Sequence, residues 1–116
     1  MVGRTQLIPK RNQRPRLIIT KNFLDELETV LNYGIMVFGK QTTQQFKEDL
    51  MTRIVTLPAF PHTNPKNRFV KSSKKKTYRY ILYEKYYVIY SVTKSTIRVI
   101  SIIHQAINPK AISKIK

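Results

Sequence analysis

The chain has 116 residues, one domain's worth, and its 22 Lys and Arg against 6 Asp and Glu give a net charge of +16. It contains no Cys, which excludes disulfide scaffolds, Cys-based zinc sites and thiol nucleophiles. Its apolar runs fall far short of the ~18 residues that a membrane span needs, and the N-terminus lacks the apolar region of a secretory signal. We therefore expect a cytoplasmic protein that does not contact the membrane and that binds a phosphate-rich or acidic partner.

The N-terminal residues 1–15 contain two prolines, basic residues without acidic ones, and no apolar period. This pattern predicts a flexible basic arm. A short first strand follows from Arg16 to Thr20. We place a single folded domain at residues 16–109 and a C-terminal tail at residues 110–116.

Two helices are predicted next, because apolar residues recur at the spacing of a helix face. The first starts after an N-cap at Thr20 or Asn22 and ends at Gly39. The second begins near Thr42 or Thr43 and ends before Pro58. Its expected buried face consists of Phe46, Leu50, Ile54 and Leu57. The short link between the helices predicts an antiparallel hairpin.

The remainder of the domain is rich in β-branched and aromatic residues, which predicts strands at 68–73, 77–84, 86–93 and 96–104. Short connections favour an antiparallel meander. The last strand is expected to be central, because it is apolar on both faces, with Ile97, Val99 and Ile103 on one side and Ile100 and Ile102 on the other.

The order of elements predicts an α+β fold. An N-terminal strand comes first, and an antiparallel helix hairpin then packs on a twisted antiparallel sheet of about four strands.

Positive charge is concentrated in the strand half, where residues 61–104 hold ten Lys and Arg and one acidic residue. Basic residues alternate there with aromatic ones, a combination that neutralises phosphates and stacks on unpaired bases. We expect these groups to converge on one concavity. The candidate target contacts are Lys71, Lys74, Lys75, Lys76, Tyr78 and Lys85. A merely solvated basic surface explains the same composition.

Two histidines, His62 and His104, are the only imidazoles. With no Cys beside them and acidic residues mostly on the helices, they do not indicate a metal site. Only three glycines occur, and none forms a phosphate-binding loop, so we expect no cofactor. His104, at a strand end, suits either a structural role or acid–base chemistry.

The stretch from Leu17 to Pro109 resembles the RelE/ParE superfamily of toxins from bacterial type II toxin–antitoxin pairs. The resemblance rests on Thr20 before the acidic helix start, on Leu57-Pro58, and on three strand motifs. These motifs are Tyr78-Arg79-Tyr80-Ile81-Leu82-Tyr83, Tyr87-Val88-Ile89-Tyr90-Ser91-Val92, and the ending from Ile97 to Pro109.

The resemblance implies a toxin that arrests growth and is neutralised by a cognate antitoxin in a hetero-oligomer. It leaves two targets open. RelE-like members cleave mRNA on the ribosome, whereas ParE-like members inhibit DNA gyrase without known nuclease chemistry. An RNA-cleaving site needs a proton acceptor, a proton donor and cations, for which Arg79, Arg98 and His104 are the candidates.

One departure from the family pattern concerns Ile107, which stands where many relatives carry an Arg. In addition, Gln105 and Ala106 supply no second acid–base group next to His104. Besides the two toxin mechanisms, two further hypotheses remain. One is a non-catalytic basic protein that binds nucleic acid or the ribosome, and the other is an inactive family member.

Overall fold

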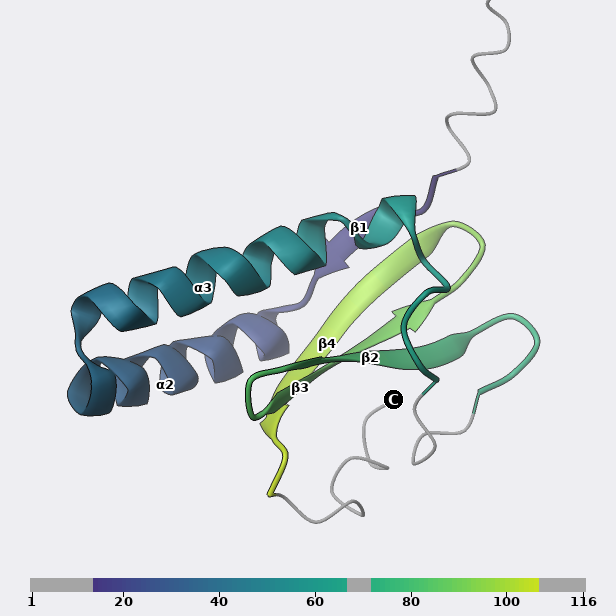
Figure 1. The fold of residues 1–116 in the computed structure, drawn as a ribbon. Helices are drawn as coiled ribbons and strands as arrows, with labels where there is room; N and C mark the ends of the chain where they lie inside the picture. The colour runs from purple at the N-terminus through teal and green to yellow at the C-terminus, as the bar shows by residue number, and fades with distance from the viewer. Residues whose placement is uncertain (1–13, 67–71, 107–116) are drawn as a thin grey trace, which may run out of the picture.

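The computed structural model describes residues 14–66 and 72–106, and Figure 1 shows a helical hairpin lying beside a twisted sheet. The elements are β1 (Arg16–Ile19), α2 (Lys21–Phe38), α3 (Lys40–Val55), the 3₁₀ helix η2 (Leu57–Ala59), β2 (Thr77–Tyr83), β3 (Tyr86–Val92) and β4 (Thr96–His104). The predicted α+β fold class is confirmed. The tail predicted at 110–116, and all but the last two residues of the arm predicted at 1–15, lie outside the described residues.

Single residues set the helix boundaries of the hairpin. Thr20 is the N-cap of α2, and its hydroxyl accepts a hydrogen bond from Phe23 N at 3.1 Å. Gly39 ends α2 with a φ of 91°, a conformation that favours glycine. The same glycine is the N-cap of α3, which therefore begins at Lys40, earlier than the predicted Thr42 or Thr43.

The sheet has four strands in the order β1-β4-β3-β2. The last three strands in the chain form the predicted antiparallel meander, and β4 is central, between β1 and β3. β1 departs from the prediction because it pairs parallel to β4, with Leu17 opposite Ile97. A parallel neighbour needs a long crossover, which the helical hairpin and the segment after it supply. The sheet is thus mixed rather than wholly antiparallel.

Of the strand predicted at residues 68–73, residues 68–71 lie outside the described part of the chain, and Ser72 and Ser73 are not in a strand. The Ser72 hydroxyl accepts from Tyr78 N at 3.0 Å, and Ser73 N donates to the Lys76 carbonyl at 2.7 Å. These two hydrogen bonds close the turn that leads into β2. The two serines therefore stabilise a turn and do not pair with another strand.

The inward and outward alternation of β4 changes at Ile100. The register with β3 shifts there and leaves Ile100 as an extra residue, a β-bulge. Ile97, Val99 and Ile102 belong to the core beneath the helices, whereas Ile103 belongs to a cluster on the opposite face. The predicted division of these residues was wrong, because a strict period of two does not persist through a bulge.

The main core lies between the helical hairpin and the sheet. Of the predicted α3 face, Leu50, Ile54 and Leu57 are buried and Phe46 is partly buried against them. Among the described residues the largest fully buried side chain is Tyr90 of β3.

Beyond the end of β1, side chains from the start of α2 form hydrogen bonds to the backbone of β4. The Thr20 hydroxyl donates to the Val99 carbonyl at 2.8 Å, and the Asn22 amide donates to the next carbonyl at 2.8 Å. The Glu26 carboxylate accepts from Ile102 N at 3.1 Å. Polar groups of an open strand edge are thereby satisfied, and α2 is fixed against the sheet.

The two helices approach closely at Gly34, where a Cβ would lie 2.8 Å from Thr43 Oγ1. We predict that Gly34→Ala lowers the free energy of unfolding by about 1 kcal/mol, because the clash outweighs the gain in helix propensity. In a Thr43→Ala background the same change should be stabilising. A double-mutant cycle by urea unfolding measures this coupling, and simple additivity would show that the contact is unimportant.

Candidate functional site

Arg79 lies in β2, opposite Tyr90 of β3, on the side of the sheet that faces the helices. Its Nη1 donates to the Asn64 carbonyl at 2.6 Å. Its Nε is buried and has no hydrogen-bond partner within the described residues. The segment that follows η2 therefore holds this half-buried guanidinium in place.

His104 ends β4, opposite Tyr86 of β3. The two rings meet edge to face with centroids 5.2 Å apart, and Tyr86 in turn contacts Phe46 of α3 at 5.8 Å. His104 Nδ1 accepts from Ala106 N at 3.1 Å. The imidazole is half-buried at the end of the sheet, within an aromatic cluster.

Arg98 lies on the other side of the sheet. Its neighbours Ile97 and Val99 are in the core beneath the helices, so the alternation of the strand directs Arg98 away from them, and it is exposed. Arg79 and His104 lie on the same face of the sheet, on the two strands that flank β3. Arg79 is opposite Tyr90 and His104 is opposite Tyr86, four residues apart on β3. Their Cα atoms are therefore about 16 Å apart. The three candidate catalytic residues do not converge, contrary to the single concavity expected from the sequence.

The candidate contact residues divide between the two ends of the β2–β3 hairpin. Lys74, Lys75 and Lys76 are exposed in the turn before β2, and Lys85 is exposed in the turn after it. Those ends are about 23 Å apart along the strand. Tyr78 is only 6% exposed, and Lys76 Nζ lies 5.9 Å from its ring centroid. Tyr78 thus supports Lys76 instead of offering a free face, and Lys71 lies outside the described residues.

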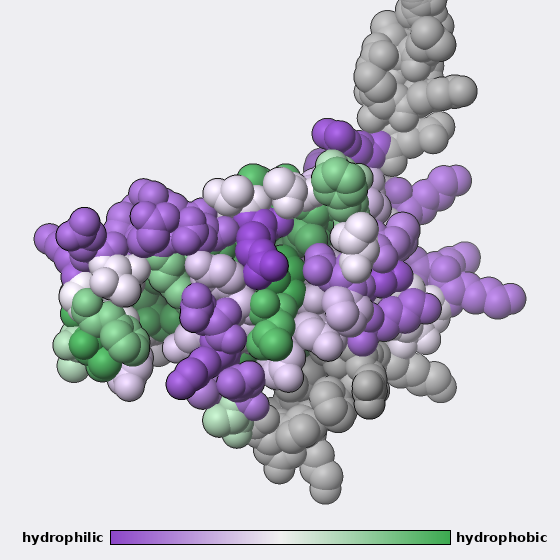
Figure 2. All heavy atoms as spheres, viewed as in Figure 1, coloured by the Kyte–Doolittle hydropathy of each residue, from purple (hydrophilic) through white to green (hydrophobic). Residues whose placement is uncertain are grey.

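The tip of the helical hairpin carries an exposed apolar patch that the sequence analysis did not identify. Figure 2 shows hydrophobic residues gathered at the end of the helices. The apolar tip consists of Ile35, Met36, Val37 and Phe38, with exposed fractions of 44%, 83%, 51% and 65%. Four consecutive apolar residues cannot all face a core from one helix, which was the available signal. Patches of this kind mark protein interaction sites.

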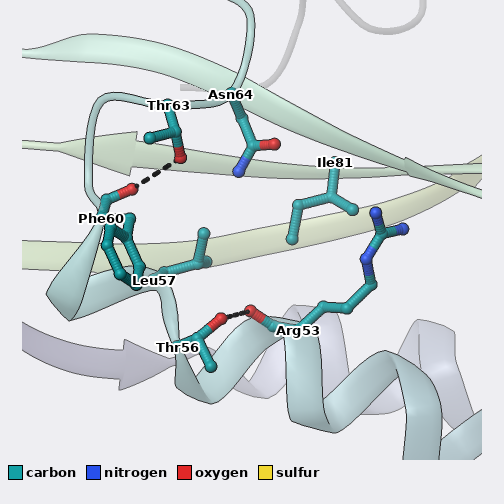
Figure 3. Close-up of a pocket in the computed structure, with 7 residues that line it drawn as sticks. All are labelled: Arg53, Thr56, Leu57, Phe60, Thr63, Asn64 and Ile81. Carbon is teal, nitrogen blue, oxygen red and sulfur yellow. Dashed lines mark hydrogen bonds between the residues drawn. The ribbon is translucent and has the colours of Figure 1, made fainter.

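Sequence reasoning also missed a pocket of about 190 Å³ between the end of α3, η2 and β2 (Figure 3). Its lining residues are Arg53, Thr56, Leu57, Phe60, Thr63, Asn64 and Ile81. Six of the seven lie within residues 53–64, and Ile81 comes from β2. They form no sequence motif that indicates a pocket. Within the described residues, no three His, Asp or Glu side chains are grouped to hold a metal ion.

A protein-family model described as the ParE toxin of the type II toxin–antitoxin system parDE matches residues 17–109. The chain belongs to the ParE toxin family. A solved structure titled as a chromosomal ParDE toxin–antitoxin system from P. aeruginosa is similar, with a TM-score of 0.64 at 12% identity over 79% of this chain and 97% of that chain. That likeness shows the fold. No curated protein sequence gives a significant match.

The match confirms the RelE/ParE resemblance. Among the helices that the structure describes in this ParE-family chain, none is both long and apolar enough to cross a membrane.

We predict that the buried Tyr90 hydroxyl makes the stability of this ParE-family chain fall at alkaline pH. Burial raises the pKa of Tyr90, while Asn64 and Arg79 partly oppose the rise. Since the unfolded phenol ionises near pH ~10 and the folded one only at higher pH, stability present below pH ~10 should be lost as pH rises further. Tyr90→Phe should reduce that loss, as measured by urea unfolding between neutral and alkaline pH. An equal loss in both proteins would assign it to other groups.

Proposed function

We propose that this chain is the growth-arresting toxin of a type II toxin–antitoxin pair and that it acts by inhibiting DNA gyrase, without cutting RNA. The separation of Arg79, Arg98 and His104 carries this proposal. In-line cleavage of a phosphodiester needs its acid, base and charge-stabilising groups within hydrogen-bond reach of one phosphate. Groups on two faces of the sheet, or about 16 Å apart on one face, do not meet that need.

The apolar tip supports a protein target. An exposed apolar surface gains little from a polyanion, whereas a protein partner buries it with a favourable free energy. The lysines at the two ends of the β2–β3 hairpin, Lys74 to Lys76 and Lys85, are then proposed as peripheral contacts that steer the target.

Ribosome-dependent mRNA cleavage is the second candidate, and the geometry of His104 favours it. Because Nδ1 accepts from Ala106 N, the hydrogen bond assigns the proton of the neutral ring to Nε2. An Nε2–H at a half-exposed strand end is suited to donate a hydrogen bond to a phosphate oxygen on which negative charge develops. In this mechanism His104 would stabilise that charge, with cations supplied by the target complex as well as by this chain.

We further propose an antitoxin as the partner of this chain, in a cytoplasmic hetero-oligomer. The support is the family itself, together with the structural relative, whose title names a toxin–antitoxin system. A neighbouring small acidic protein that relieves growth arrest on coexpression would identify it.

Induced expression tests the proposal, with the double variant Arg98→Ala/His104→Ala as the discriminating chain. The unaltered protein should arrest growth, and the variant should arrest it as well, because neither residue acts catalytically. Circular dichroism confirms that the variant is folded. Loss of arrest in a folded variant would favour the nuclease. Unimpaired growth with the unaltered protein at high expression would indicate an inactive family member or a simple basic binding protein.

A further inference from the structure

We infer that the pocket between α3, η2 and β2 binds a carboxylate, supplied by an acidic side chain that lies between apolar residues on a protein partner. The inference is independent of the toxin activity, because it concerns only the ligand of this pocket. Figure 3 shows the Asn64 carboxamide on one side of Ile81 and the Arg53 guanidinium on the other, and all three residues line the pocket. A cation and an amide group thus border one small space from different elements.

Arg53 forms no ion pair within the described residues, and Asp49, one turn earlier on α3, accepts from the Tyr83 hydroxyl at 3.3 Å instead. The ion pair found within residues 14–66 and 72–106 is Lys21–Asp25, far along the chain from this pocket. Arg53 Nη1 reaches the Leu82 carbonyl at 3.4 Å, and the guanidinium lies 5.4 Å from the Tyr83 ring centroid. A guanidinium has five N–H donors, so most of its donors remain available to a ligand. Its planar fork matches the two oxygens of a carboxylate.

Asn64 connects the pocket to a second cation. Its carbonyl accepts from Arg79 Nη1 at 2.6 Å, so the charge of Arg79 lies directly behind the residue that lines the pocket. None of the described residues that line the pocket carries a carboxylate. Two guanidinium groups beside a partly enclosed space produce a positive potential that attracts an anion.

The shape of the pocket favours a protein carboxylate over a nucleic-acid phosphate. Its remaining walls include Leu57, Phe60 and Ile81, and Phe60 is 61% exposed at the surface. These apolar groups suit the aliphatic stem and apolar neighbours of a Glu or Asp side chain.

Titration of the full chain with a short peptide, followed by NMR, tests the inference. The probe is acetyl-Leu-Glu-Leu-amide, and acetyl-Leu-Gln-Leu-amide is its matched neutral control. We expect saturable shifts of the Asn64 side-chain amide and the Thr63 amide with the Glu peptide, and binding about tenfold weaker with the Gln peptide.

Two variants that each remove one positive charge from α3 provide the control within the protein. Arg53→Gln should weaken binding of the Glu peptide about tenfold, whereas Lys47→Gln, at an exposed position outside the pocket, should leave it nearly unchanged. Equal shifts with both peptides, equal effects of both variants, or tighter binding of a short single-stranded RNA at the same amides would overturn the inference. None of these results depends on whether the chain arrests growth.

Discussion

Replacing Phe23 by alanine is expected to lower the free energy of unfolding by about 3–5 kcal/mol. Phe23 is fully buried in the main core, in the first turn of α2. Its backbone N–H is also the donor to the Thr20 cap, so the ring and the helix start are fixed at one place. Loss of the ring leaves a cavity between α2 and the sheet that close-packed neighbours cannot fill.

Urea unfolding of Phe23→Ala, with the adjacent Leu24→Ala as control, measures this loss. Leu24 is 49% exposed, so its truncation should cost less than about 1 kcal/mol. Similar losses for the two variants would contradict the placement of α2, because the helix would then have to present a different face to the sheet.

Replacing Glu26 by alanine is expected to lower the free energy of unfolding by about 2 kcal/mol. Its carboxylate accepts from the Ser101 hydroxyl at 2.5 Å and from Ile102 N at 3.1 Å, where the edge of β4 is no longer covered by β1. Removing the acceptor leaves a strand N–H and a buried serine hydroxyl without a partner. The same variant should self-associate more readily, since an open strand edge pairs with other chains.

Glu28→Ala is the matched control, because it removes the same charge from an exposed position of the same helix. Its effect on unfolding should stay within about 0.5 kcal/mol. If the two variants lost equal stability, the net charge of the helix would explain the result and the strand-edge contact would not. Sedimentation velocity of both variants checks the expected difference in association.

The helices were predictable because their signals are local. Thr20 and Gly39 act on the nearest turn of backbone, and the apolar period of α3 identified Leu50 and Ile54 as core residues. The parallel pairing of β1 was not predictable in this way, since it depends on how the chain returns after the helical hairpin. The bulge at Ile100 likewise arises from pairing with β3, and no residue within β4 predicts it from the sequence.

The candidate site was less predictable than the fold. Composition identified a basic strand half, but strand alternation and register decide that Arg98 faces away from Arg79 and His104. The pocket at Arg53 and Asn64 unites residues from α3, the segment after η2, and β2, so only the folded chain assembles it. Sequence chemistry therefore named plausible groups, while their spatial relation required the structure.

A supercoiling assay with purified DNA gyrase, relaxed plasmid and the full chain tests the proposed mechanism most directly. Translating ribosomes treated in parallel report mRNA cleavage. We predict that the chain prevents supercoiling in a concentration-dependent manner and leaves the mRNA intact. Undisturbed supercoiling together with cut mRNA would contradict the proposal and would favour a direct role for His104 in RNA cleavage.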